Sequence, residues 1–174
     1  MSSNIVEYYN QPLTGYCLFD KTESAVLKQN KSSYLLLLLF TILSLVGCLE
    51  SRRVTVQVNN INARVEVAAT PRQRQRGLMY RELLGKDEGM LMIFPEPQEV
   101  SLWMLNTRLP LDVGFFDRHG VLRSVMSMQP DGGEQLYHSP PGTLYALEMN
   151  RGWFDHYALL PGSRLKLPYA MTGE

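Results

Sequence analysis

The chain has 174 residues, of which 17 are lysine or arginine and 17 are aspartate or glutamate, so its formal net charge is zero. This balance argues against a nucleic-acid partner, because there is no surplus of positive charge with which to release counterions from phosphates. Only two cysteines are present, so a framework of several disulfides is excluded and the fold must be stabilised by its hydrophobic core.

The apolar run Tyr34–Val46 dominates the N-terminal part of the chain. It is shorter than the roughly 20 residues that cross a bilayer as a helix, but it has the length of a signal-peptide core. Lys28 and Lys31 precede the run and supply the positive flank expected on the cytoplasmic side. The run ends in Leu45-Val46-Gly47-Cys48, which resembles the lipobox of bacterial lipoproteins.

The lipobox resemblance implies a signal peptide over residues 1–47, a diacylglycerol on the sulfur of Cys48 and a tether over residues 48–53. Leu49 follows the lipidated cysteine at a position where aspartate commonly marks retention in the inner membrane. Attachment to the periplasmic side of the outer membrane is therefore favoured in a Gram-negative host. The open alternative is an uncleaved anchor helix or a buried core helix.

The residues before the apolar run are unusual for a signal peptide, because they include the acidic residues Glu7, Asp20 and Glu23. We therefore expect translation to start downstream of the first methionine. Cys17 would be lost with the signal peptide, and lipidation would consume the thiol of Cys48. The remaining domain then has no cysteine nucleophile, no thiolate metal site and no disulfide.

Short runs in the rest of the chain have the alternating or continuous apolar pattern of β-strands and are separated by turn residues. The candidate strands are Arg53–Val58, Ile61–Ala69, Gly89–Phe94, Val100–Leu105, Val113–Phe116, Val121–Met126, Leu144–Met149 and Arg164–Leu167. Asn59-Asn60 and the Asp117–Gly120 turn each join two of these runs into a hairpin. Residues 129–142 are rich in Pro, Gly, Asp and Ser and are typical of a long surface loop.

One clear helix start lies between the second and third of these runs. Thr70 is predicted as the N-cap, Pro71 occupies the first helical position, and Gln73 completes a capping box. The pattern predicts a helix of three to four turns that runs to about Leu84 and stops at Gly85. A second, short helix or a turn is expected at Gly152–Leu159.

Many short strands with one helix and frequent turns indicate a mainly β fold. We expect a compact, mostly antiparallel β-sandwich or barrel over residues 54–168, with the helix packed across one open end or face. Residues 169–174 are predicted to form a C-terminal tail.

Four motifs together resemble the signature of domain of unknown function family 192. They are Arg76–Arg81 (RGLMYR), Gly89–Leu91 (GML), Trp103–Thr107 (WMLNT) and Pro110–Asp112 (PLD). The resemblance covers about Val54 to Leu167, and it implies a small β-rich domain often found behind an export signal or a lipobox. It implies no particular activity, because the family has none established. Leu105 departs from the pattern, since a basic residue often occupies that position.

Polar and aromatic residues within these motifs are candidates for a ligand site: Arg76, Arg81, Trp103, Asn106, Thr107 and Asp112. Trp103 could stack on a sugar ring or an aromatic group while Asn106 reads its polar groups. The alternative is structural, with Trp103 in the core and the two residues after Leu105 capping a turn through hydrogen bonds to the backbone.

Asp112 and Glu148 are the candidate catalytic residues of a small hydrolase or lyase acting on envelope carbohydrate, as its acid and base. Because both lie among apolar residues, their charges should be partly buried and should need partners. We therefore expect Arg76 or Arg81 to pair with one of these carboxylates, close to the segment 103–106. The function predicted first is a ligand-binding or envelope accessory module. The hydrolase or lyase is the second, and a purely structural partner domain is the third.

No metal ion or cofactor is expected. His119, His138 and His156 lie on different turns and lack the spacing of a metal site. The many methionines lack the close repeats of a copper carrier and are predicted to fill the core.

Overall fold

The computed structural model describes residues 53–174. The predicted signal peptide, the lipidation of Cys48 and most of the predicted tether fall outside the described residues. Among residues 53–174 no helix is long and apolar enough to cross a membrane.

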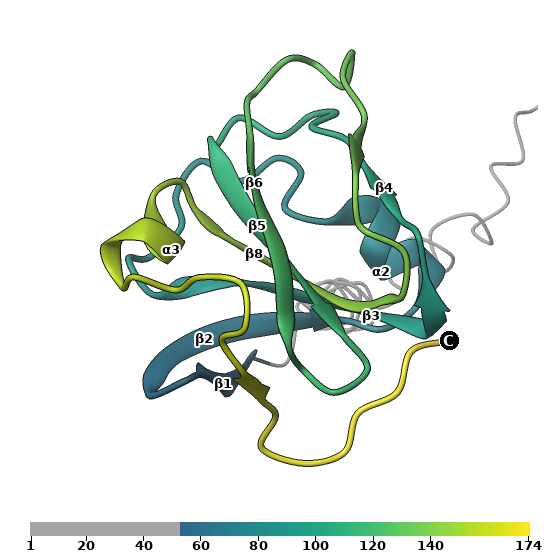
Figure 1. Ribbon diagram of the computed structural model, residues 1–174. Helices are drawn as coiled ribbons and strands as arrows, with labels where there is room; N and C mark the ends of the chain where they lie inside the picture. The colour runs from purple at the N-terminus through teal and green to yellow at the C-terminus, as the bar shows by residue number, and fades with distance from the viewer. Residues whose placement is uncertain (1–52) are drawn as a thin grey trace, which may run out of the picture. The chain divides into compact units, whose positions relative to one another are not determined.

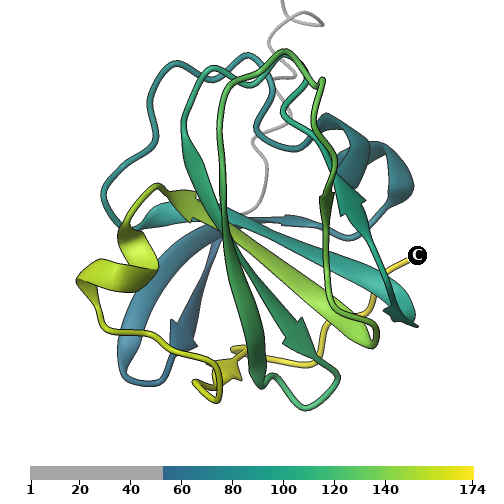
Figure 2. The ribbon, with the colours of Figure 1, turned by 45° about the horizontal axis from the view of Figure 1, so that its top comes forward.

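A seven-stranded sheet forms the body of the domain, in the order β6-β5-β8-β3-β2-β1-β9 (Figures 1 and 2). Its strands are β1 (Arg53–Val58), β2 (Ile61–Ala68), β3 (Glu88–Gln98), β5 (Leu111–Asp117), β6 (Leu122–Met128), β8 (Thr143–Asn150) and β9 (Leu165–Lys166). Every neighbouring pair is antiparallel except β2 and β3, which are parallel. The parallel pair requires a crossover, which the helix α2 (Pro71–Arg76) and the loop 77–87 supply.

The sheet curls until its two ends meet. Val121, just before β6, forms a bridge with Arg164, just before β9. The backbone N–H of Leu122 donates to the carbonyl of Ser163 at 2.8 Å. The prediction of a mainly β sandwich or barrel is thereby confirmed, as a curled half-barrel.

Apolar side chains cover both faces of the sheet, because successive residues of a strand point to opposite sides. One cluster includes Val56, Val65, Leu91, Phe116, Leu147, Met149 and Phe154. The other includes Leu78, Met90, Met92, Phe94, Val113, Phe115 and Ala146. The short helix α3 (Trp153–His156) packs on the first cluster, and the two-stranded sheet of β4 (Ser101–Leu102) and β7 (Tyr137–His138) lies over the second.

Helix α2 begins as predicted but is shorter than predicted. The Thr70 side chain accepts a hydrogen bond from the N–H of Gln73, and the reciprocal bond of the capping box is also formed. The helix ends at Arg76, after six residues, because Gly77 turns the chain at a φ of 47° and a ψ of −136°, which only glycine adopts readily. The predicted continuation to Leu84 is wrong, and residues 77–87 form a loop instead.

Two strands also differ in length from the prediction. β3 does not stop before Pro95 but continues to Gln98, with a shift in its pairing to β8 between Ile93 and Gln98. Such an irregularity accommodates prolines, which cannot donate to a sheet. The run predicted at Val100–Leu105 is a strand only at Ser101–Leu102.

The predicted C-terminal tail packs against the domain rather than extending from it. The N–H of Glu174 donates to the carbonyl of Ala69 at 2.8 Å, and Arg74 Nη2 donates to the Glu174 backbone oxygen at 2.7 Å. The tail therefore lies beside the start of α2, where Figure 1 places its end.

Candidate functional site

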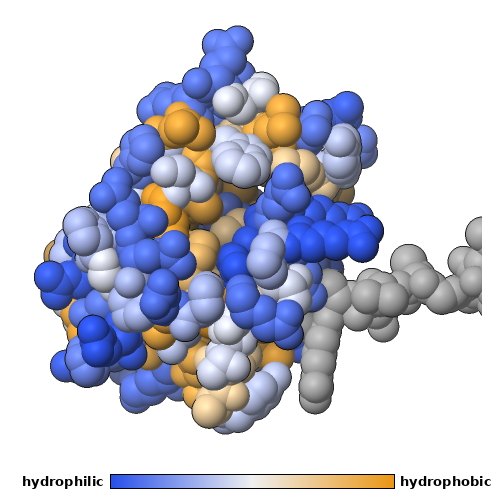
Figure 3. Space-filling view, turned by 90° about the vertical axis from the view of Figure 1, so that its right-hand side faces the viewer, coloured by the Kyte–Doolittle hydropathy of each residue, from blue (hydrophilic) through white to orange (hydrophobic). Residues whose placement is uncertain are grey.

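A pocket of about 700 Å³ opens between α2, the end of β3 and the segment 101–107. Figure 3 looks onto this side of the molecule, where apolar surface lies in a hollow bordered by polar side chains. Most of the lining is apolar: Leu78, Met79, Met92, Phe94, Leu102, Trp103, Met104 and Leu111. Its size and composition are those of a small-molecule site.

The one buried carboxyl group in the pocket wall belongs to Glu148 of β8. Glu148 is 5% exposed. Within residues 53–174 its side chain forms no ion pair and no hydrogen bond to another residue. Burial raises the pKa of this carboxyl from 4.5 to about 7. Removal from water disfavours the charged form, and no neighbouring cation compensates for that loss. The pocket thus has a carboxyl group that changes charge near neutral pH.

Sheet register explains why Glu148 points into the pocket. It lies opposite Met90 of β3 and Val113 of β5, and both of these belong to the apolar cluster on the pocket side of the sheet. Its neighbours Leu147 and Met149 point the other way, into the first cluster, on which α3 packs. A carboxyl group therefore replaces an apolar side chain on a face that is otherwise apolar.

The turn at Gly77 forms the wall that faces this carboxyl. A Cβ atom at Gly77 would lie 4.0 Å from Glu148 Oε2 and 3.5 Å from the methyl group of Met92. The absence of a side chain thus keeps the carboxyl accessible from the pocket. Arg76, one residue earlier, lines the pocket and is exposed, so it places a positive charge at the rim.

Arg74 holds this wall in place. Its Nη1 donates to the carbonyls of Ala69 and Ile93, at 2.5 and 2.7 Å, and its guanidinium lies 5.2 Å from the centre of the Phe94 ring. Burial lowers its pKa. Because these contacts join α2 to the end of β2 and to the middle of β3, Arg74 fixes the pocket wall rather than serving a ligand.

The predicted residues of the segment 103–107 have different roles. Trp103 lines the pocket and is 40% exposed, so it does not fill the core. Thr107 also lines the pocket, and its hydroxyl donates to the carbonyl of Leu105 at 3.3 Å. Asn106 does not line it; its left-handed φ of 53° shapes the turn, and its carbonyl accepts a hydrogen bond from Tyr80 at 2.9 Å.

Asp112 is buried on the opposite face of the sheet. Its two carboxylate oxygens accept hydrogen bonds from Ser127 Oγ and from the N–H of Gly152, both at 2.7 Å. In the register of β5 and β8 it lies opposite Met149, whereas Glu148 lies opposite Val113. The two carboxyl groups therefore point to opposite sides of the sheet and do not share a cleft.

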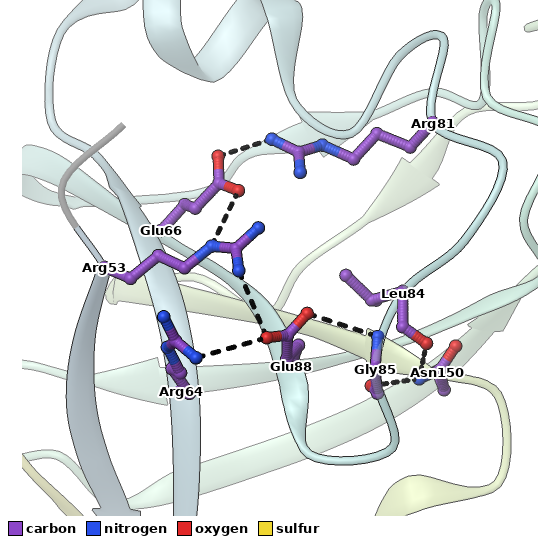
Figure 4. A network of polar contacts seen from close by, with 8 residues as sticks. All are labelled: Arg53, Arg64, Glu66, Arg81, Leu84, Gly85, Glu88 and Asn150. Carbon is purple, nitrogen blue, oxygen red and sulfur yellow. Dashed lines mark hydrogen bonds and ion pairs between the residues drawn. The ribbon is translucent and has the colours of Figure 1, made fainter. Parts of the chain in front are cut away.

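Arg81 belongs to a separate ionic network, shown in Figure 4. Its Nη2 pairs with Glu66, which also accepts from Arg53 Nε at 3.4 Å. Arg53 Nη1 in turn contacts Glu88 at 3.1 Å. The predicted pairing of an arginine with Asp112 or Glu148 is therefore wrong, because the partner of Arg81 is Glu66. Within the described residues no ion pair involves Arg76.

Sequence reasoning missed Glu66 and the methionines of the pocket. Glu66 alternates with Val65 and Val67 along β2, which is the pattern of a solvent-facing residue. It is buried because β2 is an interior strand and the loop 77–87 covers it. Met79, Met92 and Met104 line the pocket, and nothing in their spacing indicates this. The described part of the chain holds no group of three or more potential metal ligands.

The model of family DUF192, described as an uncharacterized ACR, matches residues 54–167. A crystal structure of a proposed transcription regulator from Sinorhizobium meliloti is 35% identical to this chain, with a TM-score of 0.59 over 66% of this chain and 91% of that one. A protein of unknown function from Novosphingobium aromaticivorans is 28% identical, with a TM-score of 0.63 over 66% and 85%. No curated protein matches the sequence.

Proposed function

The chain belongs to the DUF192 family, and we propose that it is a lipid-anchored protein of the cell envelope whose pocket binds a small amphipathic ligand. The observation that carries this proposal is the buried carboxyl of Glu148, which lines an apolar pocket of about 700 Å³. A buried polar group without a protein partner is costly to maintain. Binding a ligand that supplies the partner would offset that cost.

The pocket chemistry favours a ligand with an apolar body and a cationic or hydrogen-bond-donating head. Methionine and aromatic side chains supply adaptable apolar contact for the body. Above pH 7 Glu148 is mostly ionised, and a ligand ammonium group would give it the opposite charge that no residue of the described domain provides. An anionic ligand would meet like charge at the floor of the pocket.

The envelope location rests on the sequence before the described domain. The apolar run Tyr34–Val46 followed by Gly47-Cys48 supports lipidation of Cys48 and exposure on the periplasmic side. Replacing Cys48 with alanine should abolish incorporation of a fatty-acid analogue and leave the longer precursor. Undiminished labelling of the variant would refute the anchor.

The ligand proposal is tested with three probes that share one alkyl chain. At pH 8 we expect octylamine to raise the melting temperature of the soluble domain from Ser51 onward more than octanol does, and octanoate to raise it least. Glu148→Gln should remove the preference for the amine, while the exposed Glu96→Gln should keep it. Equal responses to all three probes in the unaltered protein would contradict the proposal.

An enzyme remains the second candidate function, because a carboxyl group with a pKa of about 7 suits general acid–base catalysis near neutral pH. Such a hydrolase or lyase could not use Asp112 as the partner of Glu148, since the two face opposite sides of the sheet. Turnover of an envelope carbohydrate that is lost in Glu148→Gln and retained in an Asp112 variant would favour this candidate.

A role in the regulation of transcription, as described for the S. meliloti relative, is not proposed for this chain. The formal net charge here is zero, which gives no surplus of positive charge for phosphate contacts.

A further inference from the structure

Most of the large apolar side chains that the described residues leave exposed lie at one end of the sheet. They are Tyr80, Leu83, Trp103, Leu105 and Leu136, whereas the other two, Leu160 and Tyr169, lie elsewhere. The five belong to three loops, 77–87, 103–110 and 129–136, which Figures 1 and 2 both place at the top of the molecule. Leu83 is 87% exposed and Tyr80 is 70% exposed, so neither contributes to the core.

The three loops are in direct contact. Tyr80 donates its N–H to the carbonyl of Asn106 at 2.9 Å. A Cβ atom at Gly133 would lie 2.9 Å from Leu105 Cβ, so the loop 129–136 packs against the turn beside Trp103. We call the five exposed apolar side chains on these adjoining loops the loop patch. Exposed patches of this kind mark interaction sites on soluble domains.

Hydrogen bonds hold the most exposed loop in shape. Asn150 Nδ2 donates to the carbonyls of Leu84 and Gly85, at 3.2 and 2.8 Å. Asp87, at the end of the loop, accepts from Trp153 Nε1 at 3.0 Å and from Tyr157 Oη at 2.8 Å, and the bond from Tyr157 lowers the pKa of Asp87. Leu83 is therefore presented on an ordered loop, which loses little conformational entropy when it docks.

The chain enters the domain beside this same loop. Arg53, the first described residue, contacts Glu88 at 3.1 Å and shares the carboxylate of Glu66 with Arg81 of the loop (Figure 4). Cys48 lies five residues earlier in the sequence, and five residues reach at most about 18 Å. A lipid on Cys48 would therefore hold this end of the domain close to the bilayer surface.

We propose that the loop patch docks the domain onto the bilayer in which Cys48 is anchored, with Leu83 and Tyr80 inserted at the boundary between headgroups and acyl chains. The inference rests on the proposed lipid anchor. Tyrosine and tryptophan favour this boundary because their rings are apolar at one end and polar at the other. The loop 77–87 carries two basic residues, Arg81 and Lys86, and two acidic residues, Glu82 and Asp87, so docking should depend little on anionic lipid.

The test uses the full lipoprotein, purified from membranes and reconstituted into phosphatidylcholine vesicles. Lipidation consumes the thiol of Cys48, so the variant Leu83→Cys has one free thiol in the mature protein. A polarity-sensitive fluorophore can therefore be attached at position 83 alone. Leu160→Cys is the matched control, since Leu160 is also an exposed leucine, at 67%. The carbonyl of Leu160 accepts a hydrogen bond from the N–H of Ser163, and the N–H of the following residue, Arg164, donates to the side chain of Asn59. Asn59 follows the end of β1 that is opposite to Arg53, so the control position lies away from the point where the chain enters the domain.

The label at position 83 should shift to the blue and lose emission to lipids that carry a quencher at the headgroup boundary, about 5–10 Å deep. The label at position 160 should do neither. Equal emission at both positions would overturn the docking proposal, and so would a blue shift without lipid quenching, which would indicate a second copy or a protein partner.

Mass spectrometry of the same preparations separates the two proposals. If Cys48 carries a lipid and the label at position 83 still stays in water, docking alone is wrong. If Cys48 carries no lipid, the anchor is wrong and docking falls with it. If vesicles with added phosphatidylglycerol were required for quenching, the surface would be electrostatic rather than apolar, which would also overturn the proposal.

Discussion

Replacing Glu148 with glutamine should stabilise the unliganded domain at alkaline pH. Burial raises the pKa of this carboxyl from 4.5 to about 7, so the folded state holds a proton that the unfolded state has released between these two pH values. The folded state is therefore stabilised in full below pH 4.5, where the Glu148 carboxyl is protonated in both states. The free energy of unfolding falls as the pH rises, and this contribution is lost above pH 7. At about 1.4 kcal/mol per pKa unit, the loss amounts to about 3 kcal/mol.

Urea unfolding of the soluble domain between pH 4 and pH 8.5 measures this loss directly. Glu148→Gln should match the unaltered domain at pH 4 and exceed it by up to about 3 kcal/mol at pH 8, because its side chain cannot ionise. Glu96→Gln, which changes an exposed carboxyl, is the control and should keep the original pH dependence. Parallel pH profiles for the unaltered domain and Glu148→Gln would refute the argument that burial without a partner governs this group.

Three further substitutions test the structural roles of other residues, each by denaturant unfolding at pH 7. Asp112→Ala should lose about 1–3 kcal/mol, because the partly buried N–H of Gly152 loses its acceptor; an unchanged midpoint would show that water replaces it. Gly77→Ala should lose about 1–2 kcal/mol through backbone strain at positive φ, and equal stability would mean that the turn relaxes. Arg81→Met should cost only about 1 kcal/mol, since Arg81 is partly exposed and Glu66 keeps its contact with Arg53; a cost several times larger would show a fully desolvated pair.

The parts of the fold that sequence reasoning predicted correctly depend on neighbours along the chain. The hairpin β1–β2 follows from two period-2 runs around Asn59, which adopts a left-handed φ of 53°. The start of α2 follows from Thr70, Pro71 and Gln73. Its end was also readable, since Gly77 follows a last turn with two arginines, the pattern of a helix C-terminus. The prediction passed over this glycine in favour of Gly85.

The site could be predicted only in part, because its residues depend on register and packing between distant segments. Arg76, Trp103 and Thr107 do line the pocket together with Glu148, while Arg81, Asn106 and Asp112 do not. Which carboxyl faces the pocket depends on how β8 pairs with β5, and a shift of one residue would exchange the two faces.

Residues adjacent along the chain were enough to predict that the domain is mainly β, where its hairpins turn and where its helix starts, because such residues set backbone preferences and the alternation of apolar side chains. The tertiary structure decided which charges are paired and which are not. Loop 77–87 folds over β2, so that Arg81 forms an ion pair with Glu66. Glu148 has no such cationic partner, and it lines an apolar pocket. The energy of a charge depends on what surrounds it in space, and only the packed sheet fixes those surroundings.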